Sequence, residues 1–176
     1  MRAVTFAAAA AVLTSSLVSA QATVYLIRHG EKPSDGGDGL SSQGQQRAQC
    51  LVNVFSTSSP YGIGYIMAET PKSDGSRARP YDTVEPLANS LGLSVDTSCD
   101  RDDSDCVANV VESYSGSGNI LICWEHNALT DIVSALGDSN APDYPDDSFN
   151  LIWTDPSDYG SITATTNECC PGLDSC

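Results

Sequence analysis

Residues 23–31 read Thr-Val-Tyr-Leu-Ile-Arg-His-Gly-Glu, an apolar, β-branched run that ends in charged residues. The segment 23–27 has the composition of a short strand buried in a parallel sheet. A second apolar run, 119–124, is followed by Glu125-His126-Asn127. Ligands of such sheets bind beyond the carboxyl ends of the strands. Both histidines of the chain, His29 and His126, are therefore expected where a functional site forms.

The segments between and after these runs alternate in periodicity. Helical spacing of apolar residues predicts helices over 41–55, 80–91, 104–114 and 126–136. Strand-like runs occupy 23–27, 63–68, 94–97, 119–124, 149–154 and 161–165. This alternation predicts an α/β fold, a three-layer sandwich with a mostly parallel central sheet and helices on both faces.

The charge balance excludes several classes of partner. The 176 residues contain 23 acidic side chains against 8 Lys and Arg, for a formal net charge of -15. Binders of nucleic acid and of anionic membranes need a basic surface, so neither partner is expected. Hydrophobic residues make up 40% of the chain, which is enough for one folded domain rather than an acidic disordered tail. We expect a monomer with a small-molecule partner.

The N-terminus and the cysteines indicate export. Residues 1–20 combine Arg2, an apolar run and small residues before position 22, the pattern of a secretory signal peptide. We therefore divide the chain into a signal peptide (1–20), one folded domain (21–165) and a Cys-rich tail (166–176), and expect a secreted, extracellular protein. All seven cysteines follow residue 20, where an export route permits disulfides.

An odd number of cysteines leaves one unpaired. Cys123 is the best candidate because it lies inside an apolar run. Cys99 and Cys106 bracket an acidic loop that a disulfide could close. The pairing of the remaining four stays open: Cys50, Cys169, Cys170 and Cys176. The cysteine spacing does not indicate a metal site.

The residues near the two histidines suit a phosphoryl group. Arginine binds phosphate through two parallel hydrogen bonds, and Arg28 and Arg79 flank the predicted site in the sequence. His126 begins a predicted helix, whose first amides attract anions. A histidine nitrogen is a competent nucleophile toward phosphorus, and in-line displacement needs stabilisation of the charge on the equatorial oxygens, which two arginines and a second histidine can supply. No Walker A motif is present.

Four segments resemble the histidine phosphatase superfamily, also called phosphoglycerate mutase-like. Residues 26–31 resemble its R-H-G signature, and 40–48 resemble L-[ST]-x-x-G-x-x-Q-A. Residues 79–88 are similar to its R-A-x-x-T-A-x-x-L-A segment, and 120–127 to the strand that ends in the second histidine. The four segments occur in the family's order, and the match extends over most of the expected mature chain, from about residue 23 to residue 137.

The resemblance implies roles for individual residues. His29 would be the nucleophile that forms a phosphohistidine, and Arg28, Arg79 and His126 would bind the phosphate, with no metal or cofactor. Arg77 competes with Arg79, which is preferred because it stands four residues before Thr83, as in the family pattern. Thr83 and Glu85 also match family positions but read as ordinary helix residues, and Arg47 is expected on the solvent side of its helix.

The proton donor for the leaving group is not resolved by the motifs. In many relatives an acidic residue between the second arginine and the second histidine supplies it. The acidic loop at 100–105 lies in that interval, and Asp102 and Asp103 are candidates. Glu125 is a third candidate because it adjoins His126, at a position where relatives more often carry a small residue.

These observations favour a secreted phosphomonoesterase. A mutase is the less favoured enzyme, since an exported protein would not meet cytosolic sugar phosphates and the chain is short. The alternative from another class is a catalytically inactive secreted binding or effector module on the same fold, motivated by Glu125 and by the missing clear acid.

Overall fold

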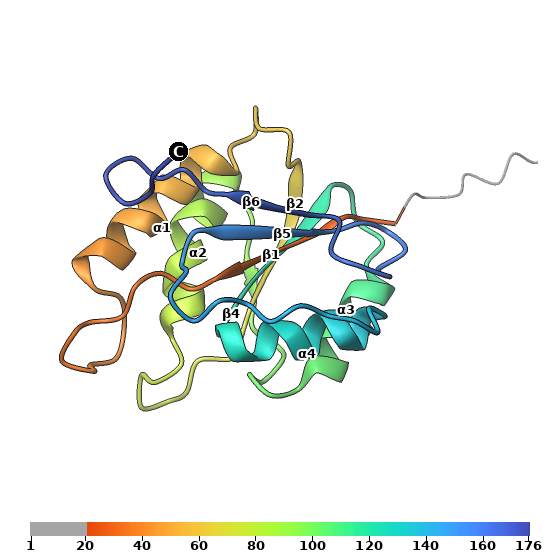
Figure 1. Ribbon diagram of the computed structural model, residues 1–176, viewed down its shortest axis with the longest axis horizontal. Helices are drawn as coiled ribbons and strands as arrows, with labels where there is room; N and C mark the ends of the chain where they lie inside the picture. Colours follow the sequence, from red (N-terminus) through yellow and green to blue (C-terminus); the bar gives the residue numbers. More distant parts are fainter. Residues whose placement is uncertain (1–20) are drawn as a thin grey trace, which may run out of the picture.

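The computed structural model describes residues 21–176, so the predicted signal peptide lies outside the described residues. The described chain forms four helices, α1 (Ser42–Val54), α2 (Arg79–Leu91), α3 (Ser104–Ser113) and α4 (His126–Leu136). It forms six strands, β1 (Val24–Arg28), β2 (Ile63–Ala68), β3 (Val95–Asp96), β4 (Asn119–Trp124), β5 (Leu151–Asp155) and β6 (Ala164–Asn167) (Figure 1). Among these residues, no helix is long and apolar enough to cross a bilayer.

The six strands make one sheet in the order β3-β2-β4-β1-β5-β6. The prediction of a mostly parallel sheet holds for β3, β2, β4 and β1, whereas β5 pairs antiparallel with β1 and β6 antiparallel with β5. The reason lies in the segment between α4 and β5. Its residue Asp146 contacts Arg28 at the carboxyl end of β1, so β5 starts from that edge and runs back.

Helices cover both faces of the sheet, as predicted. One buried cluster joins α1 and α2 to the face that carries Ile27 and Leu121. The other joins α3 and α4 to the face that carries Leu26 and Ile122. Figure 1 shows α1 and α2 together on one side of the sheet and α3 and α4 on the other. Side chains alternate between the faces along each strand, so both clusters draw on β1 and β4.

Three disulfides link the cysteines. Cys99–Cys106 forms as predicted, and Cys123 is the buried free cysteine. The four cysteines whose pairing the sequence left open form Cys50–Cys170, which ties the tail to α1, and Cys169–Cys176, which closes the tail on itself.

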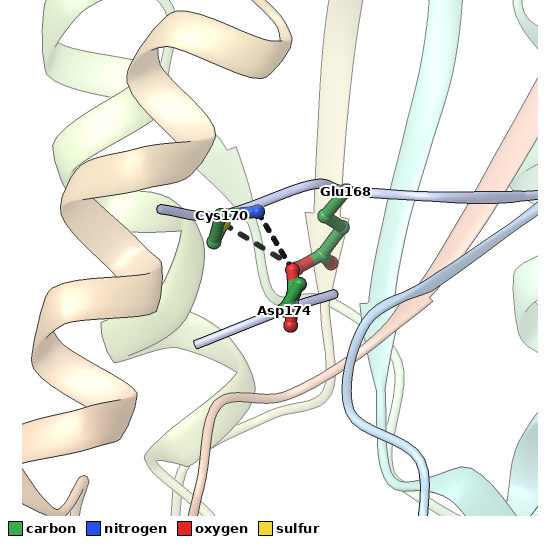
Figure 2. Close-up of side chains that lie close together, drawn as sticks. All are labelled: Glu168, Cys170 and Asp174. Atoms are coloured by element: carbon green, nitrogen blue, oxygen red, sulfur yellow. Dashed lines mark hydrogen bonds between the residues drawn. The ribbon is translucent and has the colours of Figure 1, made fainter. Parts of the chain in front are cut away.

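The expectation that Arg47 faces solvent is wrong. Its side chain is 2% exposed and makes ion pairs with three carboxylates, Glu31 at 2.7 Å, Glu168 at 2.5 Å and Asp174 at 3.0 Å. The helical pattern of α1 missed this because the tail folds over the outer face of the helix. Figure 2 shows how Glu168, Cys170 and Asp174 meet in that tail, with the backbone N–H of Cys170 donating to Asp174.

The tail cluster in Figure 2 does not fit a metal ion. A carboxylate oxygen of Glu168, one of Asp174 and the Cys170 sulfur lie within 4.8 Å of one another. However, that sulfur is bonded to Cys50 and is not a thiolate. Both carboxyl groups are already engaged by the Arg47 guanidinium. The cluster is therefore an ion-pair network that fastens the tail.

Asp155 gives a prediction for stability against pH. Asp155 is fully buried in β5, and neither of its carboxyl oxygens has a hydrogen-bond partner. Burial raises the pKa of Asp155 to about 7, with a further contribution from Asp138. The folded state therefore holds a proton between about pH 4 and 7 that the unfolded chain releases, so this group stabilises the fold at low pH and loses that effect as pH rises.

We expect Asp155→Asn to reduce the fall in melting temperature between pH 5 and pH 8, because asparagine does not ionise. Thermal unfolding of both proteins at the two pH values checks this. Glu112→Gln, an exposed carboxyl in α3, is the matched control and should keep the wild-type dependence. Parallel pH curves for wild type and Asp155→Asn would show that Asp155 does not titrate in this range.

Candidate active site

The carboxyl ends of three neighbouring strands form the candidate site. In the sheet, β4 lies between β1 and β2. Arg28 at the end of β1 pairs with Trp124 of β4, and Ala68 at the end of β2 pairs with Cys123 of β4. The next residues along each strand therefore come out at one edge.

A cavity of about 300 Å³ opens at this edge. Residues from the ends of β1, β2 and β4, from the start of α2 and from the loop closed by the Cys99–Cys106 disulfide line it: His29, Asp38, Glu69, Ser76, Arg77, Arg79, Pro80, Arg101 and Glu125. Three of the protein's few cations thus line one small cavity.

His29 is held in one tautomer. His29 is 1% exposed, and its Nδ1 lies 2.7 Å from the carbonyl oxygen of Gly30. A carbonyl oxygen only accepts, so Nδ1 carries the proton and donates it. Burial lowers the pKa of His29 to about 4, and the charges of Arg28, Lys32 and Arg79 add to the effect. At neutral pH, Nε2 therefore has a free lone pair.

Glycine at position 30 is required by packing. A Cβ at Gly30 would stand 2.9 Å from the Cα of Gly44 in α1, which is closer than side chains tolerate. The Gly30 N–H donates to the Thr83 hydroxyl at 2.9 Å, and that hydroxyl donates to the Arg79 carbonyl at 2.7 Å. Thr83 is fully buried. It is thus a positioning residue that links the His29 loop to α2, a role that the helical pattern alone did not reveal.

Arg79 enters the cavity from the first turn of α2. Its Nε and Nη2 donate to the carbonyls of Gly39 and Gly37, at 2.9 and 2.8 Å. Arg28 is more enclosed. Its Nη1 donates to the carbonyls of Asp146 and Ser148, and its guanidinium lies 3.8 Å from the centre of the Phe149 ring.

His126 begins α4 and lines a neighbouring cavity of about 400 Å³ rather than the one that His29 lines. Its Nε2 lies 3.0 Å from Asp146 and its Nδ1 lies 2.7 Å from Glu125. The structure thus brings His29 and Arg79 to one cavity. Arg28 and His126 adjoin it and share Asp146 as a partner, through its backbone and its side chain respectively.

Unpartnered polar atoms gather at this edge of the sheet. Eight buried side-chain nitrogen and oxygen atoms of the described chain lack a hydrogen-bond partner. Three of these atoms belong here: Arg28 Nε, His29 Nε2 and Arg101 Nε. A fourth, His126 Nδ1, has no hydrogen bond but lies 2.7 Å from Glu125 as an ion-pair contact. Buried polar groups are normally paired. The two arginine nitrogens are donors without an acceptor and so suit an anion that accepts hydrogen bonds, whereas His29 Nε2 offers a lone pair.

The three predicted proton donors occupy different environments. Asp103 caps α3 by accepting from the Cys106 N–H, and it does not line the cavity. Asp102 has a 65% exposed side chain that pairs with Arg77 and Arg101, also outside the cavity lining. Glu125 does line the cavity and caps α4.

Glu125 is held as a carboxylate. Burial alone would raise its pKa, but the hydrogen bond from Arg101 and the charge of His126 outweigh burial and lower the pKa below its usual value. The Arg101 Nη2 donates to Glu125 at 2.9 Å.

Sequence reasoning missed three charged residues of this cavity, Asp38, Glu69 and Arg101. Glu69 is 2% exposed and accepts from the Glu125 N–H at 3.3 Å. Burial raises the pKa of Glu69 to about 7. Glu69 follows directly after an apolar strand, as His29 follows Arg28 at the end of β1, and this position was the signal that could have identified it. Arg101 carried no comparable signal within its acidic loop.

Comparisons with known proteins place the fold. No family model and no curated protein matches the sequence. Among solved structures, a SixA protein histidine phosphatase complexed with tungstate is similar over 84% of this chain and 97% of its own, with a TM-score of 0.63 and 17% identity. A provisionally assigned SixA phosphohistidine phosphatase from Agrobacterium tumefaciens follows, with a TM-score of 0.58, 13% identity and coverage of 83% and 97%.

A third similar structure is a provisionally assigned alpha-ribazole-5′-P phosphatase from Escherichia coli, with a TM-score of 0.55 and 14% identity over 83% of this chain and 94% of its own. At this level of identity the likeness concerns the fold. The chain has the histidine phosphatase fold, which the four motifs of its sequence predicted.

Proposed function

We propose that the protein is a phosphatase that hydrolyses phosphate monoesters through a phosphohistidine at His29. The observation that carries this proposal is the state of His29: Nδ1 donates to Gly30, and Nε2 is unprotonated and unpartnered beside a cavity shared with Arg79. A neutral imidazole with a fixed proton on the far nitrogen is the form of histidine that attacks phosphorus.

The surrounding cations support the same proposal. Phosphoryl transfer depends on positive charge around the equatorial oxygens of the phosphorus. Arg28 has an unpartnered Nε, and Arg79 lines the cavity with its guanidinium tied to two loop carbonyls. His126 stands at the N-terminus of α4, where helix amides favour an anion. These groups supply the charge stabilisation, so we propose catalysis without a metal or cofactor.

The disulfides support export from the cell as part of this proposal. The described chain holds three disulfides, and such bonds persist in oxidising compartments. We propose a secreted enzyme whose substrates are small phosphoesters in the extracellular medium.

The first experiment is hydrolysis of p-nitrophenyl phosphate by the purified protein in the presence of a chelator. We expect release of phosphate, and competitive inhibition by tungstate, a tetrahedral oxyanion that is bound in the SixA structure similar to this one. Lys72→Ala, an exposed cation outside the cavity, should leave both rate and inhibition unchanged. An inert wild type that binds tungstate would support the non-catalytic binding module instead.

A further inference from the structure

We propose that Glu69 is the acid that protonates the leaving group, and that the substrates are accordingly alkyl phosphates, whose alkoxide leaves poorly without a proton. This inference rests on the proposed phosphatase function. It assigns the proton donor to the end of β2, outside the interval between Arg79 and His126 in which the motifs place it.

The sheet brings Glu69 and His29 to one cavity from two strands that β4 separates. Glu69 follows β2 and His29 follows β1, and both strands are parallel neighbours of β4. Both residues line the 300 Å³ cavity. A phosphoryl group attacked by His29 in line carries its leaving oxygen on the side away from the histidine. Glu69 lines the same cavity from a strand end two positions away from β1 in the sheet, so it can serve as the donor on that side.

Glu69 is held firmly in this place. The next residue, Thr70, is fixed by hydrogen bonds to the neighbouring loop. Its N–H donates to the Cys99 carbonyl at 2.9 Å, and its hydroxyl contacts the carbonyls of Thr97 and Cys99 at 2.7 and 2.8 Å. Cys99 is in turn fixed by its disulfide to Cys106. A proton donor needs such a fixed position relative to the reacting bond.

The environment of Glu69 favours its protonated form. Glu69 is 2% exposed. Its Oε2 accepts one long hydrogen bond from the Glu125 N–H at 3.3 Å, and its Oε1 has no hydrogen-bond partner among the described residues. Burial raises its pKa to about 7, and the carboxylate of Glu125 adds to the shift while Arg101 and Arg77 oppose it. The charged and titratable groups that share its cavity are His29, Asp38, Arg77, Arg79, Arg101 and Glu125.

The other carboxyl of the cavity edge is unsuited to the role. Glu125 is paired with Arg101 at 2.9 Å and lies 2.7 Å from His126, and its pKa is lowered. It therefore has no proton to give at neutral pH. Two carboxyls in one site with pKa values pushed apart are a common arrangement in acid–base catalysis.

The proposed reaction has two steps, transfer of the phosphoryl group to His29 and hydrolysis of the phosphohistidine. In the first, the lone pair of His29 Nε2 forms the N–P bond, the P–O ester bond breaks, and its electron pair goes to the leaving oxygen, which takes the proton of Glu69. In the second, the Glu69 carboxylate takes a proton from water as the water oxygen attacks phosphorus. The N–P bond then breaks and its electron pair returns to Nε2. The sum is ester and water to alcohol and phosphate.

The test compares two substrates with different leaving groups. p-Nitrophenolate leaves without help, whereas the alkoxide of 2-glycerophosphate needs a proton. We expect Glu69→Gln to lose about 10²-fold or more in kcat/KM on 2-glycerophosphate and to retain most of its kcat/KM on p-nitrophenyl phosphate. The comparison uses kcat/KM because this ratio does not include the later water step, which both substrates share. Glu112→Gln is the distant control. Glu125→Gln tests the other candidate acid, and it should change kcat/KM on the two substrates by the same factor.

A second measurement uses the wild type alone. Activity on 2-glycerophosphate should fall as pH rises through about 7, the pKa of Glu69, and activity on p-nitrophenyl phosphate should lack this limb. Equal losses of kcat/KM on both substrates in Glu69→Gln, or identical pH profiles of kcat/KM, would overturn the assignment while leaving the phosphatase function standing. A wild type inactive on both esters would instead overturn the proposed function, and this assignment with it.

Discussion

Replacing His29 by alanine is expected to lower kcat on p-nitrophenyl phosphate by at least about 10⁴-fold, the scale of loss when a covalent nucleophile is removed. The loss follows from the chemistry of the cavity. Arg79 and Arg101 still line the cavity and can bind an oxyanion, but the imidazole nitrogen proposed to attack phosphorus is gone. Binding of tungstate should therefore survive in the variant while turnover disappears.

The measurement is kcat from initial rates, with tungstate affinity measured by calorimetry on the same samples. His29→Asn is a second variant, because its amide can donate to the Gly30 carbonyl in place of Nδ1 and so preserve the loop. If either variant kept more than about a tenth of the wild-type kcat, far above the residual activity expected after loss of a nucleophile, His29 would not be the attacking group.

Arg47→Ala is expected to cause the largest loss of stability. Arg47 is buried against Glu31, Glu168 and Asp174. Removal of the guanidinium leaves three enclosed carboxyls without a positive charge, and breaking a buried ion pair in this way costs about 3–5 kcal/mol. The tail would lose its main contact to α1 other than the Cys50–Cys170 disulfide.

Urea unfolding at pH 8 and pH 5 measures this effect. The loss should be smaller at pH 5, because burial raises the pKa of Glu168 to about 8, so this carboxyl carries a proton at pH 5 and adds no uncompensated charge. Arg77→Ala removes a partly exposed arginine with one weak ion pair and should cost less than about 1 kcal/mol. A similar small cost for Arg47→Ala would mean that the tail cluster does not stabilise the fold.

Much of the fold is visible in the sequence because its elements are strongly patterned. The segments 63–68, 119–124 and 126–136 are predicted with the observed bounds. The direction of β5 is not predictable in this way, since it depends on where the segment after α4 crosses the sheet. The burial of Arg47 was also hidden, because the partners Glu168 and Asp174 lie more than a hundred residues away in the chain.

In the candidate site as well, local sequence patterns identified some residues and missed those that depend on tertiary packing. Residues that stand at a strand end beside a motif, His29 and His126, were found from the sequence. Glu69 stands at a strand end without a motif and was passed over, although burial gives it the most shifted carboxyl pKa of the cavity. Its protonation depends on being enclosed by α2, β4 and the disulfide loop, which no local pattern reports.

In the proposed mechanism, phosphate passes through a covalent bond to His29 Nε2. Rapid quenching of the enzyme with ³²P-labelled substrate, followed by peptide mapping under alkaline conditions, detects this bond. We expect an acid-labile label on the peptide that contains His29, linked through Nε2 because Nδ1 donates to Gly30, and no label in His29→Ala. Turnover without any labelled histidine, or a label on another residue, would contradict it.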